Sequence, residues 1–267
     1  MNLLRYCLIA IGPVVILIPV KVFAFAYLSQ VGTSQSPPVS NQSFGDPVIW
    51  RDPNIMITLD FESDFNTSAE AAMQEWDAVG SPLQLSVGLT PAQPCDNDRI
   101  NAAGWGTMTC DGQQFGDALA VTRRNFIYNT ASNTWEITDA DIIVDQSQNW
   151  FAHLSGTLPL GTQDFHRVIL HELGHTFGLE HPDEAGQQVE AIMNSSVSNI
   201  DTLQDDDKQG IIRLYGINSS TSNSGNNSTA ANTHSGGGDN SGLTYMLLGY
   251  WLPRFMRSLF IHEGENI

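Results

Sequence analysis

The segment from His171 to His181 constrains this chain more than any other feature, because it contains three histidines and a glycine in the order HELGHTFGLEH. On a helix, His171 and His175 lie one turn apart on the same face, so both rings can reach one metal ion. Gly178 permits the left-handed conformation with which helices commonly end. The chain can then turn back and present His181 as a third ligand. The spacing therefore predicts a helix that ends near Gly178 beside a three-histidine metal site.

The residues of this segment indicate a catalytic rather than a structural metal. Three neutral histidines leave the fourth position of a tetrahedral zinc ion to a water molecule. Glu172 directly follows the first histidine, and its carboxylate can take the proton of that water and return it to a leaving amine. A lone histidine is usually structural. The five specified positions together, however, arise by chance in a chain of this size on the order of once in 10⁵.

The pattern resembles the metzincin endopeptidases, and within them the matrixin branch with its small bacterial members. Met193 lies twelve residues beyond His181, where metzincins have a methionine-containing turn. Residues 138–143 resemble the strand that precedes the active-site helix in this family, and residues 204–216 resemble its C-terminal helix. Asn194 follows the methionine where serralysins and astacins place a tyrosine nearby, which disfavours those branches.

This resemblance, over about residues 48–217, implies an α+β metzincin fold with a twisted mixed β-sheet, a backing helix, an active-site helix and a small C-terminal subdomain. It implies an exported zinc-dependent endopeptidase, monomeric and acting on protein or peptide substrates. The substrate is expected to lie extended as an added strand along a sheet edge. The implied roles are one catalytic zinc on the three histidines, water activation by Glu172, and a hydrophobic floor beneath the metal from Met193.

Some features depart from the matrixins of animals. Segment 27–46 contains no cysteine that could block the zinc, so that form of latency is not expected. About twenty residues separate Val144 from Asp164, which leaves little room for the loop that holds a structural zinc and calcium ions. His153 and His166 are therefore expected to be structural. Four carboxylates could hold calcium, but their spacing does not specify a site. They are Asp117, Asp139, Asp141 and Asp145.

The two ends of the chain differ in composition from its middle. Residues 1–26 predict a cleaved signal peptide in preference to an uncleaved anchor, with an apolar run and a small-x-small site at Ala24-Phe25-Ala26. A Ser/Pro/Gln-rich lead-in without hydrophobic periodicity, 27–46, precedes the catalytic domain at 47–217. The Asn/Ser/Gly-rich segment 218–242 is typical of a flexible linker.

The tail, 243–267, combines an apolar block with arginines, and the block is too short to span a bilayer as a helix. It resembles the GlyGly-type sorting tails of some Gram-negative exported proteins. It equally fits a peripheral segment that associates with a membrane or the cell surface.

Export has a consequence for the cysteines. Cys7 lies in the predicted signal peptide, so Cys95 and Cys110 remain and predict a disulfide in an oxidising compartment. The protein is expected to be secreted or at the cell surface. Its formal net charge of −18 disfavours nucleic-acid partners.

Local patterns predict the secondary structure around the motif. Hydrophobic alternation indicates strands over 55–61 and 83–87. The turn sequence Asn-Thr-Ala-Ser-Asn separates two further predicted strands over 118–128 and 134–144. The sequence Thr67-Ser68-Ala69-Glu70 predicts a capping box at the start of a helix. Further helices are expected over about 164–177 and 205–215, and 91–116 is expected to be a loop.

Two functions from other classes remain open. The chain could be a catalytically silent, zinc-containing surface protein that binds peptides or extracellular matrix. Glu172 argues against this alternative, because such a protein needs the histidines but not the base. An anchored structural surface protein is the other alternative, and it depends only on the linker and tail. Cleavage of an unfolded protein, blocked by a zinc chelator, would separate the peptidase from both.

Overall fold

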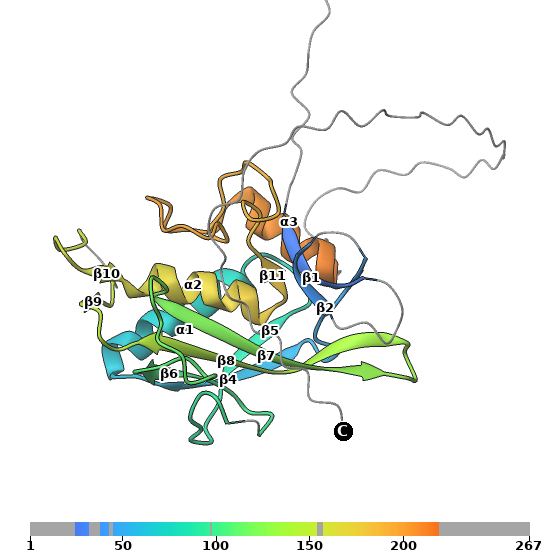
Figure 1. Cartoon of the computed structure of the whole chain (residues 1–267), viewed down its shortest axis with the longest axis horizontal. Helices are drawn as coiled ribbons and strands as arrows, with labels where there is room; N and C mark the ends of the chain where they lie inside the picture. The colour runs from blue at the N-terminus through green and yellow to red at the C-terminus, as the bar shows by residue number, and fades with distance from the viewer. Residues whose placement is uncertain (1–24, 32–37, 43–44, 97, 154–156, 219–267) are drawn as a thin grey trace, which may run out of the picture.

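The computed structural model describes residues 25–31, 38–42, 45–96, 98–153 and 157–218, and a five-stranded mixed sheet forms its centre (Figure 1). In spatial order the strands are β5 (Gln84–Val87), β4 (Asn54–Asp60), β6 (Asn101–Gly106), β8 (Thr134–Asp145) and β7 (Ala120–Asn129). The first four strands are parallel, and β7 pairs antiparallel with β8. β7 therefore forms one edge of the sheet.

Two helices, α1 (Ser63–Asp77) and α2 (Phe165–Thr176), pack side by side on one face of this sheet (Figure 1). Their contact includes Trp76, which is 2% exposed and donates its indole N–H to the carbonyl oxygen of Leu170 at 2.9 Å. Apolar side chains of both helices and of the inner strands form one continuous core. α1 is thus the backing helix that the sequence predicts, and α2 carries the histidine motif.

The capping box predicted at Thr67-Ser68-Ala69-Glu70 is wrong, because α1 begins at Ser63. Thr67 lies inside the helix, and its hydroxyl donates to the carbonyl oxygen of Ser63 at 2.9 Å. The side chain of Asn66 instead folds back onto the main chain of Phe61, and Phe65 packs edge-on against Phe165. Tertiary packing of Phe65 therefore extends the helix past the local capping signal.

The loop predicted over 91–116 contains an inner strand, β6, which corrects that expectation. Its sequence NAAGWG shows no alternation, because the strand is sandwiched between β4 and β8 and is covered on both faces. A Cβ at Gly106 would lie 2.3 Å from Cδ1 of Ile143. Small residues are therefore needed in this strand, and because they show no hydrophobic periodicity the strand is not predicted from the sequence.

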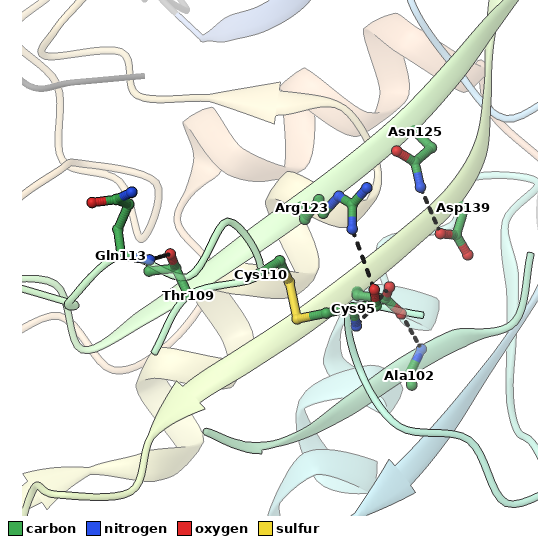
Figure 2. The surroundings of a disulfide bond; sticks show 9 residues. Cys95, Ala102, Thr109, Cys110, Gln113, Arg123, Asn125 and Asp139 are labelled. Carbon is green, nitrogen blue, oxygen red and sulfur yellow. Dashed lines mark hydrogen bonds between the residues drawn. A yellow bond between two sulfur atoms is a disulfide. The ribbon is translucent and has the colours of Figure 1, made fainter. Parts of the chain in front are cut away.

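Cys95 and Cys110 form the predicted disulfide, which closes the loop that contains β6 (Figure 2). Asp141 of β8 holds this loop, since its carboxylate accepts the main-chain N–H groups of Cys95 and Ala102, both at 3.0 Å. Arg123 donates to the carbonyl oxygen of Cys95 at 3.3 Å. The disulfide loop is therefore anchored to the two strands that lead to the edge of the sheet.

The segment predicted as a lead-in contributes three strands to a second sheet: β1 (Ala26–Gln30), β2 (Pro38–Gln42) and β3 (Asp46–Pro47). β1 pairs antiparallel with β11 (Leu179–Glu180), which lies within the histidine motif. Leu28 also donates its N–H to the carbonyl oxygen of Gly178 at 2.9 Å. Ala26, Leu28 and Ser29 are all buried, so no alternation marks the strand. The predicted domain boundary at 47 falls inside β3, and the predicted cleavage site falls at the start of β1.

We expect a fragment that starts at residue 47 to unfold at a temperature roughly 5–10 °C below a 25–217 fragment. Removing β1 exposes the surfaces that cover Leu28. Burying one leucine contributes about 2 kcal/mol to the free energy of unfolding. In a domain of this size each kcal/mol shifts Tm by about 2–4 °C. Calorimetry of both metal-free fragments measures the difference. The 25–217 fragment with Leu28→Ala should lie between them, and equal values for all three would contradict a supporting role for β1.

The remaining elements complete the domain. β9 (Trp150–Phe151) and β10 (Gln163–Asp164) form a short parallel pair before α2, and α3 (Asp205–Tyr215) has the predicted bounds. None of the helices in the described ranges is both long and apolar enough to cross a bilayer. The predicted signal peptide up to residue 24, the predicted linker from residue 219 and the tail lie outside the described residues.

Candidate metal centre

The three histidines of the motif are brought together as the sequence predicts. His171 and His175 lie on α2, which ends at Thr176, and Gly178 adopts a φ of 93°. A side chain at Gly178 would be strained by this conformation, and its Cβ would lie 2.8 Å from the carbonyl oxygen of Val48. The chain turns back here and places His181 beside the other two.

The ring nitrogens have the separation that a tetrahedral metal requires. The Nε2 atoms of His171 and His175 are 3.1 Å apart, and that of His181 lies 3.1 and 3.0 Å from them. Ligands at the usual zinc–nitrogen distance would be about 3.3 Å apart around a tetrahedral ion. Across the described ranges, this is the one group of three or more His, Cys, Asp or Glu residues close enough to share an ion. The donor set therefore fits zinc.

The second nitrogen of each ring fixes its orientation. Nδ1 of His171 lies 2.8 Å from the carbonyl oxygen of Ile192, and Nδ1 of His175 lies 2.9 Å from that of Leu179. A carbonyl oxygen can only accept a hydrogen bond, so these Nδ1 atoms carry the proton and the Nε2 lone pairs face the centre. Nδ1 of His181 lies 3.2 Å from Oε2 of Glu184.

Burial favours the neutral form of two ligands. It lowers the pKa of His171 to about 4 and the pKa of His175 well below its usual value, with His181 adding to both effects. Burial also acts to lower the pKa of His181, but the hydrogen bond and charge of Glu184 outweigh it and raise that pKa. His181 is therefore the ligand at which a proton competes best with the metal.

We expect zinc binding to weaken by about tenfold per pH unit between roughly pH 6 and 4. In this window the raised pKa keeps His181 protonated without metal, whereas His171 takes a proton only near its pKa of about 4. Zinc binding then displaces one proton. Below this window the plot of affinity against pH becomes steeper, because His171 is protonated as well. Competition with a chelating dye measures affinity against pH. Glu184→Gln should move the onset to lower pH, and a slope of two protons throughout would contradict this order.

Glu172 lies next to the metal ligands and outside the group they form. Its side chain is 5% exposed, and Oε2 accepts the hydroxyl of Thr122 on β7 at 2.6 Å. Burial raises the pKa of Glu172 to about 7, although the Thr122 hydrogen bond acts to lower it. A carboxyl group with a pKa near neutrality can both accept and donate a proton at working pH.

Met193 packs against the helix between the two ligands that α2 carries. A Cβ at Gly174 would lie 2.2 Å from Sδ of Met193, so only glycine allows this approach. Asp207 of α3 holds the turn, because its carboxylate accepts the N–H groups of Ile192 at 2.9 Å and Met193 at 3.1 Å. Through Ile192, the same turn holds the ring of His171.

Sequence reasoning missed the contacts that β7 makes with the motif. Arg124 places Nη2 2.5 Å from Oε1 of Glu180 and Nη1 3.3 Å from the carbonyl oxygen of His175. Thr122 and Arg124 are two positions apart on a strand, and this spacing was the only available signal that they share a face. Nothing in the local pattern indicates that this face meets α2.

The other residues considered as ligands lie in separate places. His153 pairs with Asp164 at 2.5 Å, and His166 lies 3.4 Å from Glu75. Of the four candidate calcium ligands, Asp139 and Asp141 are buried on β8, Asp117 is exposed, and Asp145 accepts hydrogen bonds from Ser147 and Gln148. The structure does not bring these four carboxylates together.

Four features are those of the metzincin α+β fold: the mixed sheet with one antiparallel edge strand, the helix that ends at a glycine, the convergent histidines and the methionine turn. A family model described as Matrixin matches residues 109–216, which include all three histidines, Glu172 and α3. This part of the chain is therefore similar to the matrixin family.

Comparison with curated proteins finds no match. Among solved structures, one described as "Structure of Myroilysin" is 13% identical, covers 63% of this chain and 82% of its own, and has a TM-score of 0.32. A second, "Crystal structure of myroilysin", is 15% identical, covers 73% and 93%, and has a TM-score of 0.33. The similarity to the matrixin family depends on the family model rather than on these two structures.

Proposed function

We propose that this protein is an exported, zinc-dependent endopeptidase whose catalytic base is Glu172. The observation that carries the proposal is the pairing of three convergent Nε2 atoms, 3.0–3.1 Å apart, with a buried carboxylate that is not one of the ligands. A silent zinc-containing binding protein would need the histidines, but it would gain nothing from burying Glu172 at a cost in desolvation.

Each residue has a role that follows from its contacts. His171, His175 and His181 would hold zinc, with their Nδ1 atoms held by the protein, and Met193 would form the floor beneath the ligands. When bound, zinc would polarise the substrate carbonyl and acidify a water molecule. Glu172 accepts the proton of the attacking water and passes it to the leaving amine. Burial raises its pKa to about 7 without metal, which supports a role in both transfers.

The outer edge of β7, which no strand of the described residues pairs with, is the surface on which an extended substrate would add as a further strand. β7 runs from Ala120 to Asn129 at the edge of the sheet, and Thr122 and Arg124 contact the motif from it. The edge therefore continues beyond the metal centre toward Asn129. An edge that continues past the site can hold residues far from a chain end, which favours an endopeptidase.

Export, the domain division and the role of the tail belong to the same proposal. The apolar start of the chain and the Cys95–Cys110 disulfide support secretion or a cell-surface location. Because β1 pairs with the motif, we place the catalytic unit at about 25–217 rather than 47–217. The tail would sort or anchor the enzyme, and deleting 243–267 should then move activity from the cell fraction to the medium.

Digestion of an unfolded protein by the purified full-length chain tests the proposed activity. Internal fragments should form, a zinc chelator should stop the reaction, and added zinc should restore it. Sequencing the new termini distinguishes internal cleavage from trimming of the ends. Zinc binding at one equivalent without any cleavage would overturn the proposal and support the silent binding protein instead.

A further inference from the structure

One hydroxyl group approaches the carboxylate of Glu172 from the strand that borders the site. Oγ1 of Thr122 lies 2.6 Å from Oε2 of Glu172 and 3.1 Å from its carbonyl oxygen. That carbonyl oxygen also accepts the hydroxyl of Thr176 at 3.2 Å. A threonine hydroxyl has a single proton to donate. We therefore assign the hydrogen bond of Thr122 to the shorter contact, the one with the Glu172 carboxylate.

The position of this hydroxyl is fixed by the sheet. Thr122 pairs with Ile142 in the β7–β8 ladder, and Arg124 pairs with Ala140. Arg124 lies two residues further on the same face and donates to the carbonyl oxygen of His175. A slip of β7 would break both contacts with α2, and the β-branched side chain of threonine is stiff about χ1.

A hydrogen bond to one oxygen of a carboxylate also fixes the orientation of its other oxygen. A glutamate side chain has several rotatable bonds, and without a partner its carboxylate could turn away from the attacking water. The hydrogen bond to Oε2 leaves Oε1 to receive the proton. A base must lie within hydrogen-bond reach of the proton it takes, and a displacement of about 1 Å can cost on the order of 100-fold in rate.

We propose that Thr122 is a positioning residue for Glu172, so that the strand which receives the substrate also aims the catalytic base. This inference depends on the proposed endopeptidase function. Thr122 acts through Glu172 and has no role in holding the metal, since the histidine rings are held by Ile192, Leu179 and Glu184. Its loss should therefore affect turnover and leave metal binding unchanged.

Two substitutions at this position separate the hydroxyl from the shape of the side chain. Thr122→Val keeps the branched shape and removes the hydroxyl, whereas Thr122→Ser keeps the hydroxyl and removes a methyl group. Thr138→Val is the matched control on β8, because the Thr138 hydroxyl donates to the main-chain carbonyl oxygen of Asn125 at 3.3 Å. The full-length protein is assayed for kcat, KM and zinc content.

We expect Thr122→Val to lower kcat by about 10- to 100-fold, with KM and zinc content within about twofold of the unsubstituted protein. Thr122→Ser should keep kcat within about threefold, and Thr138→Val should leave it unchanged. In a Glu172→Asp background, whose shorter side chain no longer reaches Thr122, the valine substitution should have little further effect.

The outcomes distinguish this inference from the function on which it depends. If the unsubstituted protein does not hydrolyse peptides, the proposed function fails. If it does, and Thr122→Val keeps a normal kcat or loses no more than Thr138→Val, the positioning role of Thr122 is wrong. Equal losses in the glutamate and aspartate backgrounds would also overturn it, because the effect would then not pass through the Glu172 carboxylate.

Discussion

Replacing Glu172 with alanine should reduce peptide hydrolysis by about 10⁴-fold while zinc remains bound at one equivalent. The carboxylate is not a ligand, so coordination by the three histidines is spared. It would, however, serve both the proton transfer from water and the transfer to the amine. Single general acid–base contributions are typically 10²–10⁴-fold, and one group that serves both steps is expected at the upper end.

His175→Ala is the comparison that makes this result specific. It leaves two protein ligands where a catalytic zinc site needs three, so both zinc content and activity should be lost. Because His175 also bonds to the carbonyl oxygen of Leu179, order around β11 should fall as well. Zinc content by mass spectrometry and peptide cleavage rates are measured for both variants. A Glu172→Ala protein that cleaves at a near-normal rate would exclude Glu172 as the base.

The parts of the site that sequence predicts are those that depend on local geometry. His171 and His175 lie one helical turn apart whatever the rest of the chain does, and Gly178 marks the place where that helix must end. The side chains that support them come from far along the chain. Thr122 lies 50 residues before Glu172, and only the register of β7 brings the two together.

The fold shows the same limit. β7 and β8 are predicted with nearly correct bounds because a polar turn separates two runs of strand-forming residues, whereas β6 and β1 carry neither alternation nor such a turn. The start of α1 is set by the packing of Phe65 against Phe165 rather than by the local capping signal. Alternation and turn residues therefore locate the strands that carry these signals, and segments that lack them or are extended by tertiary contacts escape prediction.

Removing one partner of the buried ion pair between Arg124 and Glu180 is expected to cost far more stability than removing one partner of an exposed ion pair. The two side chains are 12% and 2% exposed, with 2.5 Å between Nη2 and Oε1. Removing one partner of a buried pair leaves an uncompensated charge and typically costs about 3–5 kcal/mol. Arg124→Ala should therefore lower Tm by roughly 10 °C. It should also weaken zinc binding, because Arg124 bonds the main chain of His175 next to β11.

Arg51 offers the matched control, since it forms an ion pair with Glu136 at 3.3 Å but its side chain is 67% exposed. Arg51→Ala should cost no more than about 1 kcal/mol and leave zinc affinity unchanged. Replacing the whole buried pair with apolar residues, Arg124→Met with Glu180→Leu, should recover much of the stability that Arg124→Ala loses, because no buried charge remains. Zinc affinity should stay low in the double variant if the guanidinium contact with His175 is what holds the loop. Full recovery of both properties would show instead that Arg124 serves only to neutralise Glu180.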